Sequence, residues 1–134
     1  MKLPNLILAS GSPRRAEILR SVGWDFSKIV ADIDETERPG EFAAEYVQRL
    51  ALEKAQKVSE SIESGLILGA DTTVVVDDQI IGKPVDTEDA RRMIRMLAGK
   101  CHEVLTGVAF VKKESSDAGP IVREIVGLQT TLVK

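Results

Sequence analysis

The chain has 134 residues, of which 43% are apolar, enough for one hydrophobic core and too few for two full domains. Its 18 Lys and Arg against 21 Asp and Glu give a net charge of −3, and only 4% of the residues are aromatic. These values argue against a nucleic-acid binder, which needs a broadly basic surface or repeated aromatic platforms. The single Cys101 excludes an internal disulfide, and no apolar run reaches the roughly 18 residues of a membrane helix, so we expect a cytoplasmic protein without a membrane segment.

The first predicted elements are a strand, a turn and a helix. Residues 3–9 end in an apolar run, and apolar side chains follow at helical spacing from Ile18. Ser12 is a favourable N-cap, and Pro13 takes the first helical position, where its missing N–H costs nothing. Residues 24–31 then predict a second strand.

The middle of the chain predicts an acidic segment, a long helix and a buried strand. Residues 32–45 carry six Asp and Glu against one Arg. Residues 42–62 are rich in good helix formers, and residues 66–77 are almost all apolar or β-branched, as in a strand covered on both faces. A turn after residue 77 returns the chain into a short hairpin strand at residues 80–81.

The last third predicts a helix and two strands. The helix begins after Asp86 and stops near Gly99, and strands follow at residues 103–111 and 121–133. The polar residues 112–119 between them predict a mobile loop. Because strands and helices alternate along the chain without a linker, the sequence predicts one α/β domain.

A phosphate site is the first functional candidate. Residues 10–15, SGSPRR, join the first strand to the first helix. A helix N-terminus offers free N–H groups and positive potential, to which this segment adds two hydroxyls and two guanidiniums. The alternative is an ordinary N-capped helix with two solvated arginines. Arg14 and Arg15 point about 100° apart on a helix, so both need not reach one ligand.

A carboxylate inside the central strand is the second candidate. Asp71 lies in an apolar segment, where an ionised carboxylate is costly without a cation, a metal or several hydrogen bonds. In a cleft it could act as general base or metal ligand, and the alternative is that it caps a loop. Lys54 shares the apolar stripe of the long helix and either enters the same anionic site or snorkels to solvent.

Further candidates carry weaker signals. Lys83, after the hairpin, either returns towards Asp71 or stays a solvated loop residue. Glu35 either supplies a second carboxylate for a divalent ion or belongs to a solvated acidic surface. Cys101 and His102 are neighbours that point to opposite faces of a strand, so we expect no nucleophilic pair and a partly buried, inert Cys101.

Five segments in this order resemble the Maf family of nucleoside triphosphate pyrophosphatases. They are LASGSPRR at residues 8–15, EKA at 53–55, GADT at 69–72, GKP at 82–84 and HEVLTGV at 102–108. The resemblance runs from residue 3 into the final strand. It implies a single Maf/inosine-triphosphatase-like α/β domain over residues 1–134, with a mixed twisted sheet flanked by helices and a nucleotide cleft.

The same resemblance implies a reaction and its residues. The substrate is a nucleoside triphosphate, cut to the monophosphate and pyrophosphate with a divalent cation, Mg²⁺ or Mn²⁺. Asp71 is implied as the base that activates water and, with Glu35, as a metal ligand. The implied substrate-binding residues are Ser10, Ser12, Arg14, Arg15, Lys54, Thr72 and Lys83. Arg14 after Pro13 and Thr72 after Asp71 resemble the branch that prefers dTTP and UTP over 7-methyl-GTP.

The resemblance also leaves alternatives open. Members of the family continue beyond the strand matched by residues 121–133 with a helix and a DKAGAYGIQG-like segment that contributes to base selection. We therefore expect the C-terminal part of the family domain to be missing and apolar surface to stay uncovered. The alternatives are a non-catalytic nucleotide-binding or septum-related regulatory protein, or an inactive fragment. The exposed edge strand could pair in a homodimer.

Overall fold

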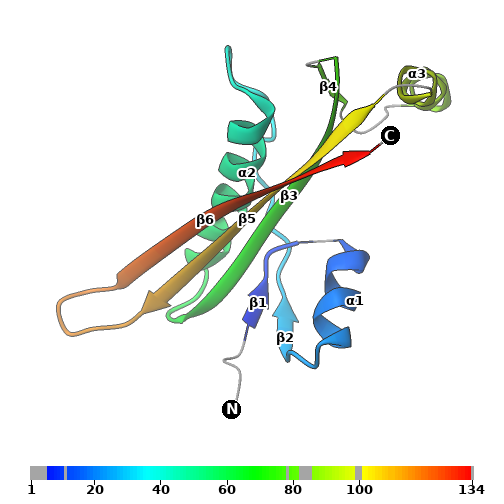
Figure 1. The fold of residues 1–134 in the computed structure, drawn as a ribbon. Coiled ribbons are helices and arrows are strands. Elements are labelled where there is room, and N and C mark those ends of the chain that lie inside the picture. The colour runs from blue at the N-terminus through cyan, green and yellow to red at the C-terminus, as the bar shows by residue number, and fades with distance from the viewer. Residues whose placement is uncertain (1–5, 11, 78, 82–85, 99–100, 134) are drawn as a thin grey trace.

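A mixed six-stranded sheet organises the chain (Figure 1). The computed structural model describes residues 6–10, 12–77, 79–81, 86–98 and 101–133. In chain order the elements are β1 (Leu6–Leu8), α1 (Pro13–Ser21), β2 (Phe26–Lys28), α2 (Ala43–Ser59), β3 (Gly65–Val76), β4 (Gln79–Ile81), α3 (Thr87–Leu97), β5 (His102–Glu114) and β6 (Ile121–Val133). The strand order is β2-β1-β3-β5-β6, with β4 paired to β3. The predicted single α/β domain with a mixed sheet is confirmed.

The strands divide into a parallel and an antiparallel part. β1 pairs in parallel with β2 and β3, and β3, β5 and β6 continue as antiparallel neighbours. Figure 1 shows these last three strands as long twisted ribbons that extend well beyond β1 and β2. No helix in the described part of the chain combines the length and apolar character needed to cross a membrane.

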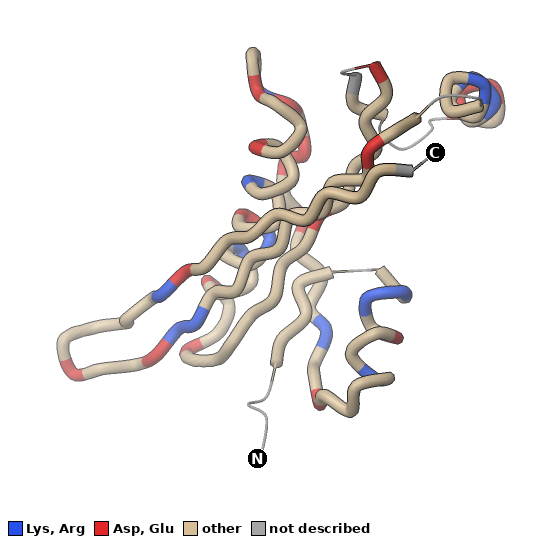
Figure 2. Tube along the Cα trace, in the orientation of Figure 1, with Lys and Arg blue, Asp and Glu red and all other residues tan. Residues whose placement is uncertain are grey.

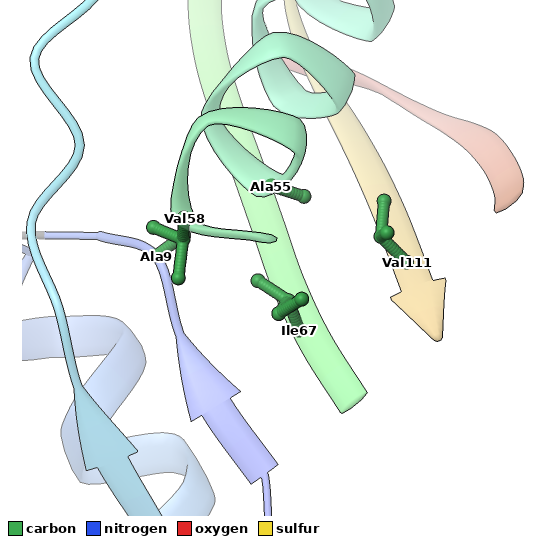
Figure 3. Close-up of a cluster of buried hydrophobic side chains, with 5 residues drawn as sticks. All are labelled: Ala9, Ala55, Val58, Ile67 and Val111. Atoms are coloured by element: carbon green, nitrogen blue, oxygen red, sulfur yellow. The ribbon is translucent and has the colours of Figure 1, made fainter. Parts of the chain in front are cut away.

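Each face of the sheet carries its own core, because successive strand residues point to opposite faces. On the face covered by α2, the buried cluster consists of Ala9, Ala55, Val58, Ile67 and Val111 (Figure 3). On the face covered by α1, it consists of Leu6, Leu8, Ala16 and Leu19. The two helices therefore hold the sheet from opposite sides.

Several predicted boundaries were wrong for identifiable reasons. The strand expected at residues 24–31 is only Phe26–Lys28, because its short partner β1 offers few hydrogen-bonding groups. The loop expected at residues 112–119 is shorter, since β5 continues to Glu114 and pairs there with Ile121. Cross-strand hydrogen bonds thus outweigh the polar composition of this segment. Cys101 is exposed, not partly buried as expected.

β6 lies at the edge of the sheet with its apolar side chains in solvent. Ile125 is 72% exposed and Leu132 is 58% exposed. The helix α2 reaches β6 through a hydrogen bond from Gln56 Nε2 to Glu124 Oε2 at 2.8 Å. The expected apolar surface on this strand is therefore present among the described residues.

Two glycines let α2 lie close against the sheet. A Cβ added at Gly69 would overlap the carbonyl oxygen of Ala51, and one added at Gly107 would overlap the backbone of Val47. Gly69 is on β3 and Gly107 is on its neighbour β5, so both central strands need this space. This close approach fixes how far side chains of α2 stand from those of β3.

We expect Gly107→Ala to lower the free energy of unfolding by about 1–3 kcal/mol, because its methyl group would push α2 off the sheet. Gly127→Ala on β6 is the control, since a Cβ there meets nothing within 4 Å. Urea unfolding of both variants measures the difference. Equal unfolding midpoints for Gly107→Ala and the parent chain would contradict the packing described.

Candidate active site

The candidate site lies along a stretch of β3 that has no partner on one side. β1 pairs with β3 only at Leu66–Leu68, and β4 pairs with it only from Val74 onward. Among the described residues, residues 69–73 therefore pair only with β5, and we call them the open edge. The carboxyl end of β1 and the start of α1 meet this edge, which is where open α/β sheets bind ligands.

An ion-pair cluster occupies the α2 side of the open edge. Lys54 Nζ lies 3.0 Å from Asp71 Oδ1 and 3.3 Å from Glu35 Oε1. The Lys54 and Asp71 side chains are 16% and 15% exposed, whereas Glu35 is 49% exposed. Asp71 is thus a strand residue with a cationic partner, as predicted, and does not cap a loop. Lys54 turns into the site and does not snorkel to solvent.

Arg15 connects three segments on the other side of the open edge. Its Nη1 donates to Ser10 Oγ at 3.1 Å, and its Nη2 donates to Thr72 Oγ1 at 3.0 Å. The Thr72 hydroxyl also lies 3.1 Å from Thr106 Oγ1 on β5. Burial lowers the pKa of Arg15, and the nearby Asp71 carboxylate opposes that shift. The guanidinium remains charged and is held in place before any ligand arrives.

A cleft of about 790 Å³ opens between α1 and the sheet beside Arg15. Ser12, Arg14 and Thr72 also line this arginine cleft. Arg14 itself is exposed, so the two neighbouring arginines differ in burial as their angular separation predicts. Together they give the cleft an anion-binding character.

The predicted cap of α1 is only partly right. Ser12 occupies the N-cap position, but its side chain makes no capping hydrogen bond. Its backbone N–H instead donates to Ser10 Oγ at 3.2 Å. The Ser12 hydroxyl is therefore available to a ligand in the arginine cleft. Lys83, the remaining predicted phosphate-binding residue, lies outside the described residues.

Arg49 holds the acidic segment that carries Glu35, a role that sequence reasoning missed. Arg49 Nε lies 2.6 Å from Glu41 Oε2, and its Nη1 lies 2.8 Å from Glu53 Oε1. Its Nη2 donates to the Thr36 carbonyl oxygen at 3.0 Å. The four-residue spacing of Arg49 and Glu53 on α2 was the only local sequence feature that indicated an ion pair of Arg49. The hydrogen bond from Arg49 lowers the pKa of Glu41 from its usual 4.5 to about 2.

Tyr46 is a second residue that sequence reasoning did not single out. Its hydroxyl donates to the Glu35 backbone oxygen at 2.6 Å, so it also fixes the acidic segment to α2. Burial raises the pKa of Tyr46, and the carboxylates of Asp71 and Glu35 raise it further. The carboxylates near Tyr46 thus come both from β3, with Asp71, and from the acidic segment, with Glu35 and Glu37. Figure 2 marks the acidic positions along the chain in red.

The carboxylates of Asp71 and Glu35 fit a divalent cation whose other ligands come from water and the substrate. Asp71 and Glu35 both direct carboxylate oxygens at the Lys54 ammonium. Carboxylate oxygens are also the ligands that Mg²⁺ and Mn²⁺ take. The described residues contain no cluster of three or more His, Cys, Asp or Glu side chains for a metal. A bound Mg²⁺ would therefore complete its shell with water and phosphate oxygens, as it commonly does. Lys54 would have to yield its place between the carboxylates.

The sequence is similar to a family model and to curated proteins. A family model described as Maf-like protein matches residues 5–133. The dTTP/UTP pyrophosphatase of Hahella chejuensis is 55% identical over 112 residues, covering 81% of this chain and 56% of that protein. The dTTP/UTP pyrophosphatase of Symbiobacterium thermophilum is 44% identical over 132 residues, covering 98% and 64%. The chain spans about three fifths of the length of these curated relatives.

Solved structures show the same fold at low sequence identity. The Ham1 protein of Staphylococcus aureus aligns with a TM-score of 0.52 and 13% identity, covering 94% of this chain and 70% of that one. A Ham1 protein from Coxiella burnetii aligns with a TM-score of 0.52 and 18% identity, covering 94% and 72%. The sheet and its flanking helices are therefore an arrangement shared with these proteins.

Replacing Glu41 with Gln should change how stability depends on pH. Because the pKa of Glu41 is about 2 in the folded chain, below its unfolded value, the Arg49 contact stabilises the fold fully above about pH 5. This stabilisation is lost as the pH falls towards 2. We expect Glu41→Gln to have a lower urea midpoint than the parent near pH 6 and the same midpoint near pH 2.

The exposed Glu63→Gln is the matched control, and its midpoint should follow that of the parent across the range. A constant difference between Glu41→Gln and the parent at every pH would contradict the role assigned to the charged pair.

Proposed function

Because the chain belongs to the Maf-like protein family, we propose that its site hydrolyses dTTP and UTP to the nucleoside monophosphate and pyrophosphate. The observation that carries this proposal is a largely buried carboxylate, Asp71, between the cations Lys54 and Arg15 at the open edge. The names of the relatives from Hahella chejuensis and Symbiobacterium thermophilum support the choice of substrates.

Asp71 is the proposed general base. Its carboxylate takes a proton from a water molecule, whose oxygen attacks the α-phosphorus. The bond from this phosphorus to the bridging oxygen breaks, and pyrophosphate leaves with the electron pair. Lys54 holds Asp71 at 3.0 Å in the free chain and would turn to the phosphate oxygens when substrate binds. The ammonium then leaves the carboxylate free to accept the proton.

Arg15 neutralises the charge that develops on the leaving pyrophosphate. Its hydrogen bonds to Ser10 and Thr72 fix the guanidinium before the reaction, so little reorganisation is needed when charge moves. Arg14 and the Ser12 hydroxyl line the same arginine cleft and extend the phosphate-binding surface. The proposed substrate-binding residues are thus Ser10, Ser12, Arg14, Arg15, Lys54, Thr72 and Lys83.

A divalent cation fits this scheme. Asp71 and Glu35 would hold Mg²⁺ or Mn²⁺, with Arg49 and Tyr46 keeping the Glu35 segment in place. When bound, the cation would neutralise part of the phosphate charge and lower the pKa of coordinated water.

A nucleotide-binding protein without turnover is the second candidate. The observation that favours it is the Lys54–Asp71 ion pair, since a carboxylate that stays bound to an ammonium is a poor proton acceptor. Calorimetry with UTP, together with a pyrophosphate assay, distinguishes the two candidates. Binding of UTP without release of pyrophosphate supports the second candidate, and release of pyrophosphate supports the first.

Asp71→Asn should lower pyrophosphate release from dTTP and UTP by about 10²–10⁴-fold, because the amide cannot accept the proton. The measurement is a coupled pyrophosphate assay with Mg²⁺ or Mn²⁺, with urea unfolding to confirm that the variant is folded. Asp117→Asn, in the exposed turn after β5, is the control and should keep the parent rate. Release at the parent rate by Asp71→Asn would refute its role, and no release by the parent chain from either substrate would refute the proposed reaction.

Arg15→Lys tests whether the fixed guanidinium matters beyond its charge. A lysine keeps the positive charge but cannot hold Ser10 and Thr72 in the fork geometry of arginine. We expect kcat/KM for UTP to fall about tenfold or more, the scale of one lost charged hydrogen bond. Arg91→Lys on α3 is the control. A parent-like kcat/KM for Arg15→Lys would show that charge alone is sufficient.

A further inference from the structure

One hydroxyl of the Arg15 network belongs to a residue without a part in the proposed hydrolysis. Thr106 lies in the segment HEVLTGV at residues 102–108 and is the register partner of Thr72 on β5. Both threonines line the arginine cleft, on the face of the sheet that α1 covers. Their hydroxyl oxygens lie 3.1 Å apart. The Thr106 hydroxyl therefore stands beside the cations proposed to hold the triphosphate.

Arg15 restricts what the hydroxyls around it can do. A guanidinium only donates hydrogen bonds, so every oxygen that it contacts must accept. Ser10 Oγ accepts from Arg15 Nη1 at 3.1 Å and from the Ser12 backbone N–H at 3.2 Å, which occupies both of its lone pairs. The Ser10 hydroxyl can then act towards a ligand only as a donor.

The same reasoning orders the two threonines. Thr72 Oγ1 accepts from Arg15 Nη2 at 3.0 Å. A hydroxyl that accepts from a cation becomes a stronger donor and a weaker acceptor, because bonds in a hydrogen-bonded chain polarise one another. This polarisation favours Thr72 as the donor and Thr106 as the acceptor of the bond between them. The Thr106 hydrogen then has no acceptor within the described part of the chain and is left for a molecule in the arginine cleft.

A set of donors selects the chemistry of the ligand. Ionised phosphate oxygens accept hydrogen bonds and have no hydrogen to donate, so they match hydroxyls that only donate. Hydrogen bonds to an anion are roughly twice as strong as those between neutral groups. Arg14 and Arg15 line the same cleft and attract an anion to it. The Thr106 hydroxyl is therefore placed and polarised for a phosphate oxygen.

We propose that Thr106 is a further substrate-binding residue, whose hydroxyl donates a hydrogen bond to an oxygen of the leaving pyrophosphate at the end of a chain from Arg15 through Thr72. The proposal rests on the proposed function, because it takes the triphosphate to lie in the arginine cleft. Arg15 then acts on the substrate twice, through its own charge and through the hydroxyl that it orders.

Thr106→Val tests this hydrogen bond, because valine keeps the shape of threonine and suits a strand but has no hydroxyl. By calorimetry at one fixed concentration of Mg²⁺, we expect the Kd for inorganic pyrophosphate to rise about tenfold, the scale of one hydrogen bond to a charged group. We expect kcat/KM for UTP to fall by a similar factor. Thr106→Ser, which keeps the hydroxyl, should retain most of the parent affinity and rate.

Thr130→Val is the matched control on the neighbouring strand. Thr130 is exposed and pairs with Leu105, so its side chain lies on the opposite face from Thr106. Its Kd and kcat/KM should equal those of the parent. If Thr106 only joined two strands, Thr106→Val would shift the urea midpoint and leave the Kd for pyrophosphate unchanged, and that result would overturn the proposal.

A double-mutant cycle tests the order of the hydroxyls. Without the Thr72 hydroxyl, Arg15 no longer polarises Thr106, so Thr106→Val should raise the Kd for pyrophosphate less in a Thr72→Val background than in the parent. Equal increases in both backgrounds would overturn the chain from Arg15 through Thr72.

Binding measurements separate failure of this contact from failure of the reaction. If UTP is hydrolysed but Thr106→Val keeps the parent Kd and kcat/KM, the Thr106 contact is wrong and the proposed function stands. If UTP is not hydrolysed but Thr106→Val weakens the binding of pyrophosphate and of α,β-imido-UTP, the proposed function is wrong and the contact stands. Absence of binding of both ligands by the parent chain overturns the contact.

Discussion

The Lys54–Asp71 ion pair is the interaction on which the candidate site depends. Two side chains that are each about 15% exposed meet at 3.0 Å, one from a helix and one from the central strand. Burial of either charge without a partner would be costly, because an unpaired charge loses most of its hydration on burial. The pair forms because α2 rests on the sheet at Gly69 and Gly107, where no side chain keeps the backbones apart. Close packing of a helix on a sheet thus sets the position of the proposed base.

The short first strand supplies the second constraint. Since β1 ends at Leu8 while β3 continues to Val76, the open edge lies beside the turn into α1. Arg15 crosses this gap and ties the turn to β3 through Ser10 and Thr72. On the opposite side, Arg49 draws the acidic segment onto α2. The cationic arginine cleft therefore lies on the α1 face of β3 and the Lys54–Asp71 pair on its α2 face, and the two meet at the open edge.

Local sequence patterns predicted the parts of this site that have a local cause. An aspartate in an apolar strand needs a cation, and a lysine on the apolar stripe of a helix is positioned to provide it. The pairing of Asp71 with Lys54 was therefore predictable from the sequence. The contacts of Arg15 with Ser10 and Thr72 and the Arg49–Glu41 contact were not predictable in this way. Each depends on how segments distant in sequence meet. The extension of β5 to Glu114 has the same origin, since pairing with β6 overrides a polar composition.

The most direct measurement follows the oxygen atom of the attacking water. If Asp71 activates water beside the α-phosphorus, UTP hydrolysed by this chain in water labelled with heavy oxygen yields UMP that carries the label and pyrophosphate that does not. Mass spectrometry of the two products reads this directly. Label in the pyrophosphate, or release of inorganic phosphate in place of pyrophosphate, would contradict the proposed position of the reacting phosphorus at Asp71.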